Sequence, residues 1–201
     1  MTQYARPDSD VSDGSFLNAS GNNTNLYQSI DESSASDSDY VISTDSGYSA
    51  DNMTVGLSNV TDPENAANHV VRYRAKGDAG MGMGGSVPSL TVALFEGSTQ
   101  RASSTNGSVA TSFTDYNFSL STSEANAISD YTDLRLKFTR AAAGSGPSIT
   151  ISQAYFECDD AGGGGDSTAL PMAMNTYRQM RSLDVFKAEY SQSGSGYRSI
   201  P

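Results

Sequence analysis

Apolar and polar residues alternate in short segments along the first 160 residues, and Gly, Asn, Asp, Ser or Pro separates one segment from the next. Alternation with a period of two is typical of a β-strand that buries one face. The clearest case is 134–140, where Leu134, Leu136 and Phe138 alternate with basic or polar residues. Seven further segments are candidate strands: 26–30, 40–43, 53–57, 69–76, 90–96, 116–120 and 149–155. About eight short strands at this spacing predict an all-β sandwich or barrel.

In two of these segments, the alternation indicates which residues share one face of the strand. In 69–76 the alternation assigns Tyr73 to one face and Arg72 and Arg74 to the other. In 149–155 the alternation continues to Tyr155 and is broken by Phe156. One short helix interrupts the strands, because Ser121 and Glu124 have the spacing of a capping box.

Four consecutive glycines at 162–165 mark a boundary in the chain. A run of glycine holds neither a helix nor a strand and acts as a flexible linker. We therefore predict a β-sandwich domain at 1–160, a Gly-rich linker at 161–166 and a partly helical C-terminal arm at 167–201.

Apolar residues recur at helical spacing in the C-terminal arm. From 177 to 186 they are three residues apart, so the apolar stripe drifts around the helix and wraps half of it. Two interpretations follow: the arm contacts partner surfaces, or it folds back on its own sandwich. The residues assigned to partner contact are Met172, Met174, Tyr177, Met180, Leu183, Phe186 and Tyr190.

Serine and threonine, 33 and 16 residues, replace much of the apolar content of an ordinary domain. The formal net charge of −11 argues against nucleic acid as a partner, because nucleic-acid binding needs a basic face. A membrane is not expected as a partner either, because no apolar run is long enough to span a bilayer. The first residues lack the apolar core of a secretory signal, so none is expected.

The sequence offers no motif for catalysis. His69 is the only histidine and Cys158 the only cysteine, and no Gly-x-Ser-x-Gly element surrounds a serine nucleophile. Cys158 precedes two aspartates, whose charges raise the pKa of a thiol and make it a poor nucleophile. We therefore expect a protein that is not an enzyme.

Three aspartates near a glycine form a candidate calcium site. Asp8, Asp10 and Asp13 precede Gly14 and resemble the first half of a calcium-binding loop, without its regular spacing or its late glutamate. The alternative is that these carboxylates accept hydrogen bonds from loop backbone N–H groups. No other cofactor is expected.

A series of short motifs runs in order along residues 4–158. The motifs are YARPD at 4–8, DG at 13–14, LY at 26–27, IDE at 30–32, DSDY at 37–40, DP at 62–63, HVVRYR at 69–74, LTV at 90–92 and SDYTDLRLKF at 129–138. The series resembles a group of β-sandwich structural proteins of tailed bacteriophages. This resemblance implies a jelly-roll-like sandwich and a non-enzymatic role in the virion, as a capsid decoration or cement protein or as a tail or neck accessory.

The resemblance also implies partners and a location. The expected partners are other virion proteins, such as the major capsid protein, and further copies of this chain in a homo-oligomer such as a trimer. The expected location is the virion, assembled in the cytoplasm of the bacterial host.

Two other classes of function stay open. One is a carbohydrate-binding module of a virion tail or fibre that touches a host glycan, which tyrosines gathered on one sheet face would favour. The other is a hydrolase domain of a phage tail, which needs a cleft with two carboxylates or a complete nucleophile unit.

Overall fold

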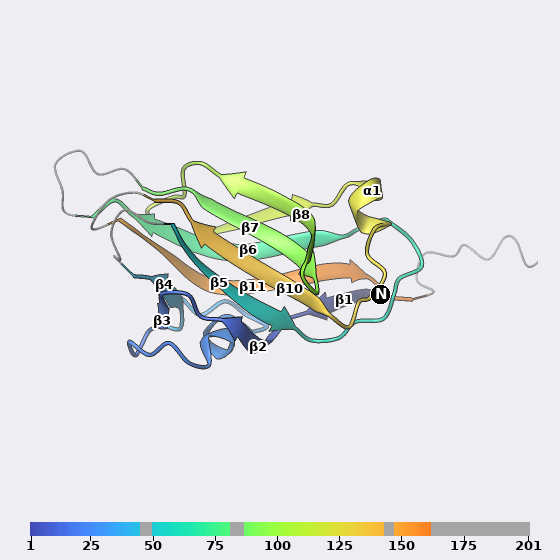
Figure 1. The fold of residues 1–201 in the computed structure, drawn as a ribbon, viewed down its shortest axis with the longest axis horizontal. Helices are drawn as coiled ribbons and strands as arrows, with labels where there is room; N and C mark the ends of the chain where they lie inside the picture. The colour runs from blue at the N-terminus through green and yellow to red at the C-terminus, as the bar shows by residue number, and fades with distance from the viewer. Residues whose placement is uncertain (45–49, 81–86, 143–146, 162–201) are drawn as a thin grey trace, which may run out of the picture. The chain divides into compact units, whose positions relative to one another are not determined.

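The computed structural model describes residues 1–44, 50–80, 87–142 and 147–161. Within these residues, eleven strands form two antiparallel sheets that enclose one apolar core (Figure 1). The predicted all-β sandwich is confirmed. The predicted C-terminal arm at 167–201, with all seven residues assigned to partner contact, lies outside the described residues, as does the linker beyond Ala161.

The chain passes repeatedly from one sheet to the other. The six-stranded sheet has the order β3-β4-β11-β6-β9, and β1 also pairs with β11; its strands are β1 (Thr2–Ala5), β3 (Phe16–Asn18), β4 (Val41–Ser43), β6 (Val70–Asp78), β9 (Thr114–Ser119) and β11 (Ser148–Asp159). The five-stranded sheet has the order β2-β5-β10-β7-β8; its strands are β2 (Pro7–Ser12), β5 (Asp51–Leu57), β7 (Leu90–Glu96), β8 (Thr99–Asn106) and β10 (Leu134–Arg140). Because β4 to β7 and β9 to β11 alternate between the sheets, the topology is jelly-roll-like.

The core is filled by the inward-facing residues of both sheets. In β10 the predicted alternation is confirmed, since Leu134, Leu136 and Phe138 are buried and the basic residues between them face outward. Phe138 lies opposite Met53 of β5 and Val92 of β7, and all three side chains are fully buried. The central strands of the five-stranded sheet therefore supply much of the apolar contact that stabilises the sandwich.

The longest strand, β11, changes phase in its middle. Ile149 and Ile151 face the core, and the register with β6 then shifts between Ile151 and Gln153, which marks a β-bulge. Beyond the bulge it is Ala154 and Phe156 that are buried. The phase break thus comes before Phe156, and it moves Tyr155 from the predicted inward side to the outer face.

The segment 26–30, predicted as a strand, is a 3-10 helix, η1 (Leu26–Ser29). The carboxylate of Asp10 accepts hydrogen bonds from the backbone N–H groups of Leu26 and Tyr27, at 3.0 and 2.9 Å. Leu26 and Ile30 are both buried and lie four residues apart, a spacing that fits the period of a strand as well as that of an α-helix. The strand prediction was wrong because two apolar residues fit either period.

The predicted short helix is the single turn α1 (Thr122–Ala125), and its capping box is present. Ser121 accepts a hydrogen bond from the backbone N–H of Glu124, and the Glu124 carboxylate accepts one from the backbone N–H of Ser121. Among the described residues, no helix is long and apolar enough to cross a membrane.

Four strands escaped the sequence analysis: β1, β2, β3 and β8. The two longest of them, β2 and β8, lie at the two edges of the five-stranded sheet and are largely polar. An edge strand with an exposed side shows little of the apolar alternation that identifies a strand in the sequence. Backbone hydrogen bonds hold it in the sheet, and these bonds do not require a particular side-chain pattern.

Candidate functional site

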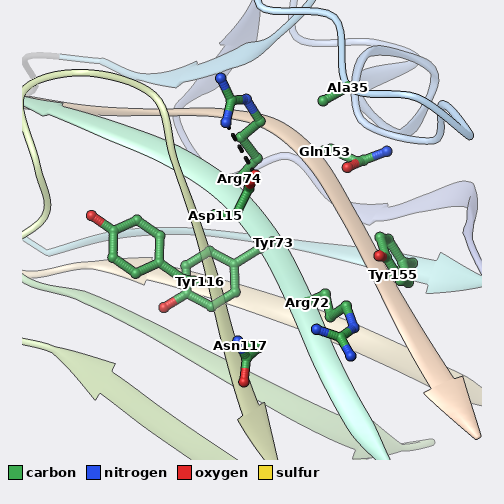
Figure 2. A pocket seen from close by; sticks show the side chains of 9 residues that line it. All are labelled: Ala35, Arg72, Tyr73, Arg74, Asp115, Tyr116, Asn117, Gln153 and Tyr155. Carbon is green, nitrogen blue, oxygen red and sulfur yellow. Dashed lines mark hydrogen bonds and ion pairs between the residues drawn. The ribbon is translucent and has the colours of Figure 1, made fainter.

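A groove of about 310 Å³ crosses the outer face of the six-stranded sheet (Figure 2). Two rows of side chains form its floor, each with one residue from β11, one from β6 and one from β9. The first row is Tyr155, Arg72 and Asn117, and the second row is Gln153, Arg74 and Asp115. Ala35, Tyr73 and Tyr116 complete the lining. We call this hollow the sheet groove.

Contacts outside the sheet groove fix the ring of Tyr155. The guanidinium carbon of Arg6 lies 4.9 Å from the centre of the Tyr155 ring, and the Tyr4 ring meets it edge to face with centres 5.7 Å apart. Arg6 is held in turn by a 2.6 Å hydrogen bond from its Nη1 to the carbonyl oxygen of Glu32. Tyr155 lines the groove, whereas Arg6 and Tyr4 do not, so the contacts that fix this ring come from outside the groove.

Arg72 lies between Tyr155 and Asn117 and retains donor capacity (Figure 2). Its Nε donates to Oε2 of Glu157 at 2.6 Å, a hydrogen bond that raises the pKa of Arg72 above its usual value. In the described part of the chain, neither Nη1 of Arg72 nor the side-chain amide of Asn117 has a hydrogen-bond partner. These atoms are therefore available to a ligand.

Arg74, in contrast to Arg72, forms ion pairs with two carboxylates. Its Nε and Nη2 donate to the two carboxylate oxygens of Asp37, both at 2.8 Å, and its Nη1 donates to Oδ1 of Asp115 at 3.1 Å. Asp37 also accepts a hydrogen bond from the Ser152 hydroxyl at 3.1 Å. Bidentate pairing of this kind is specific in geometry, so Arg74 holds the segment that carries Ala35 against the sheet.

The Arg74–Asp37 pair should make stability depend on pH. Hydrogen bonds from Arg74 hold the pKa of Asp37 below its usual value of 3.8. The pair therefore stabilises the fold above about pH 3.8, and this contribution is lost as the pH falls below that value. Because the Asp37 side chain is 43% exposed, we expect Asp37→Asn to lower the melting temperature by only about 1–4 °C at neutral pH.

Thermal melts followed by circular dichroism between pH 7 and pH 3 test this expectation. The difference between the wild type and Asp37→Asn should shrink toward zero at the acidic end. Glu64→Gln, which neutralises an exposed carboxylate in another loop, is the control for the loss of one surface charge. A constant difference across the range would contradict the role of the ion pair.

The single histidine and the single cysteine are packed inside the sandwich. His69 is buried, with Nδ1 2.8 Å from the carbonyl oxygen of Ala67 and Nε2 2.7 Å from the Tyr131 hydroxyl. A carbonyl oxygen only accepts, so Nδ1 donates to Ala67, and Nε2 shares a hydrogen bond with the Tyr131 hydroxyl. Burial, and secondly the charge of Asp159, raises the pKa of Cys158 to about 12. Neither His69 nor Cys158 lines the sheet groove.

The three aspartates of the candidate calcium site are engaged in separate contacts. Asp10 accepts the N–H groups that begin η1, Asp13 accepts a hydrogen bond from the Asn23 amide at 2.7 Å, and Asp8 accepts one from the Ser9 hydroxyl at 2.9 Å. Within the described ranges there is no group of three His, Cys, Asp or Glu side chains arranged to hold a metal ion. The structure thus gives the calcium interpretation no support, whereas Asp10 makes the backbone hydrogen bonds that the alternative interpretation describes.

None of the groove residues was singled out as a site residue by the sequence analysis. It assigned Arg72 and Arg74 to the face of their strand opposite Tyr73, and in the structure this face is the outer one. Asn117, Gln153 and Tyr155 come from strands far away in the sequence, and the register that brings them beside β6 is a property of the folded sheet. The one signal in the sequence that could have indicated this site was the pair of arginines on the same side of a strand in an acidic chain.

No family model matches the chain, and no curated protein matches it. Among solved structures, the chain is similar to a family 61 carbohydrate-binding module in complex with β-1,4-galactotriose, with 9% identity, 60% of this chain and 71% of that chain covered, and a TM-score of 0.38. A variant of a family 29 carbohydrate-binding module has 12% identity, coverage of 87% and 98%, and a TM-score of 0.41. The enzymatically active domain of tailspike protein 4 from bacteriophage CBA120 has 13% identity, coverage of 78% and 19%, and a TM-score of 0.41. With TM-scores this low, these likenesses carry no argument about function, which has to come from the groove itself.

Proposed function

We propose that the sandwich is a non-catalytic carbohydrate-binding module and that the sheet groove holds its glycan. The observation that carries this proposal is the first row, in which the fixed ring of Tyr155 lies beside the available donors and acceptors of Arg72 and Asn117. A sugar ring has C–H groups that pack on an aromatic ring and hydroxyls that both donate and accept. A rigid aromatic surface next to a few placed polar groups matches both properties.

The extent of the sheet groove also supports a glycan. The two rows lie on three neighbouring strands, β11, β6 and β9, and neighbouring strands are about 4.8 Å apart. The floor therefore extends over ~10 Å, which is wider than one sugar ring. A stretch of oligosaccharide fits this floor better than a single sugar.

The gathering of tyrosines on one sheet face favours this function over a capsid role. Tyr4 and Tyr155 both lie on the outer face of the six-stranded sheet, in contact with each other. The residues assigned to contacts with virion proteins lie outside the described residues. Capsid decoration, a homo-oligomer and a place in the virion therefore stay predictions without support from the structure.

A glycan array probed with the full chain, followed by calorimetry on each positive glycan, tests the proposal. We expect Asn117→Ala to weaken binding about 3- to 10-fold, because one hydrogen bond contributes about 1 kcal/mol. Asn117 is exposed and has no side-chain hydrogen bond within the described residues, so its loss should leave the fold unchanged. Ser103→Ala, an exposed position on β8 of the other sheet, is the matched control.

Two outcomes would contradict the proposal. One is the absence of binding to every glycan on the array. The other is binding that Asn117→Ala and Ser103→Ala leave equally intact, since the glycan would then occupy another part of the molecule.

A further inference from the structure

Both arginines on the floor of the sheet groove already have carboxylate partners. Arg72 is paired with Glu157 at 2.6 Å, and Arg74 is paired with Asp37 at 2.8 Å and with Asp115 at 3.1 Å. Two positive and three negative charges make this set −1 overall. The guanidinium groups therefore offer a ligand hydrogen-bond geometry without net positive charge.

The segment beside the groove adds further negative charge. Burial raises the pKa of Glu32, and the charges of Asp39 and Asp31 raise it further. The pKa of Asp31 is also raised, by burial first and then by the charge of Asp39, while the charge of Arg6 acts in the opposite direction. Carboxylates that repel one another here would also repel an anionic ligand that enters beside them.

The atoms that remain for a ligand are a mixture of donors and acceptors. Nη1 of Arg72 can donate, and the amide of Asn117 can do both. Gln153 donates from Nε2 to the Glu32 carbonyl oxygen at 2.7 Å, so its Oε1 is the atom left to accept. Asp115 uses Oδ1 for Arg74, and its side chain is 81% exposed, so Oδ2 also accepts.

A hydroxyl group satisfies such a mixture, because it donates to one neighbour and accepts from another. A carboxylate or sulfate can only accept, so it would leave Oε1 of Gln153 and Oδ2 of Asp115 facing acceptor oxygens. An acceptor that loses water without gaining a donor costs binding free energy. The paired charges and the available donor and acceptor atoms thus both disfavour an anionic ligand.

We infer that the sheet groove selects uncharged glycans and rejects glycans that carry uronate or sulfate groups. The inference rests on the proposed function, because it names the class of glycan that the same groove takes. It also fits the chain as a whole, whose net charge of −11 repels polyanions from a distance.

Calorimetry with the full chain tests the inference on two sets of probes. Hexasaccharides of glucose, galactose, mannose and xylose are the neutral probes, and hexasaccharides of galacturonate, mannuronate and heparin are the anionic ones. We expect at least one neutral probe to bind with an affinity that changes less than twofold between 20 and 500 mM NaCl (roughly the range over which surface charges become screened). At the low salt concentration, where repulsion is strongest, every anionic probe should bind at least about tenfold more weakly than the best neutral probe.

A charge-neutralising variant sharpens the test. Asp115→Asn removes an exposed carboxylate, while Arg74 keeps its bidentate partner Asp37. We expect the ratio of anionic to neutral affinity to rise about two- to fivefold in this variant. Asp130→Asn, an exposed position in a loop away from the groove, should leave that ratio unchanged.

The outcomes separate this inference from the proposed function. An anionic probe that binds as tightly as the best neutral probe, or tighter, overturns the selection for uncharged glycans and leaves glycan binding in place. A lack of binding by both sets overturns the proposed function itself. An affinity ratio that Asp115→Asn does not change would show that the paired charges do not determine selectivity.

Discussion

Replacing Tyr155 by alanine is expected to weaken glycan binding at least about 30-fold, a loss of about 2 kcal/mol. The ring belongs to a residue that lines the sheet groove, and its position is fixed by Arg6 and Tyr4 before any ligand arrives. A preorganised aromatic ring loses little side-chain entropy on binding. Its removal therefore takes away contact area that neighbouring residues cannot replace.

Two further variants show whether the ring itself carries the effect. Tyr155→Phe keeps the ring and should retain most of the affinity measured by calorimetry. Phe95→Ala removes a partly exposed aromatic side chain from the outer face of the five-stranded sheet, and it should leave the affinity unchanged. Equal losses from Tyr155→Ala and Phe95→Ala would mean that the glycan does not lie in the sheet groove.

The melting temperature of Tyr155→Ala should stay within a few degrees of the wild type. The side chain lies on the outer face, and its contacts with Arg6 and Tyr4 are surface contacts. Substitutions on an outer face away from the core change stability by small amounts. A large fall in the melting temperature would mean that weakened binding reflects loss of the fold.

The central strands could be predicted from the sequence because their alternation reflects burial directly. β5, β6, β7 and β10 each pack an apolar face against the opposite sheet, and in each the inward residues appear in the sequence at every second position. The same alternation assigns Arg140 to the inward side of β10, where it is fully buried. Burial is thus set by position in the strand even when the residue is charged.

The sheet groove could not be predicted, because a bulge decides which way Tyr155 points. Without the register shift between Ile151 and Gln153, Tyr155 would follow Ile149 and Ile151 into the core, as the alternation predicted. A bulge of this kind inserts one residue into the ladder with no fixed sequence signature. The two arginines were assigned to the correct face, but the carboxylates that neutralise them come from residues 37, 115 and 157. Only the folded sheet brings these residues together.

Replacing Phe138 by alanine is expected to lower the free energy of unfolding by about 3–5 kcal/mol, because it leaves a cavity that the surrounding core fills only in part. The ring is fully buried on β10, the middle strand of the five-stranded sheet, between Met53 and Val92. Urea unfolding followed by circular dichroism measures the loss, with Phe95→Ala as the matched control on the same sheet.

The pair of phenylalanine variants tests the sandwich apart from its function. Phe95 faces outward and Phe138 inward, so the same change in side chain should cost less than about 1 kcal/mol at the first position and several at the second. In urea-free solution, folded Phe138→Ala should still bind the glycan with near wild-type affinity, since Phe138 belongs to the sheet that does not carry the groove. Equal destabilisation by the two variants would contradict the assignment of β10 to the core, and with it the register that sets the faces of the five-stranded sheet.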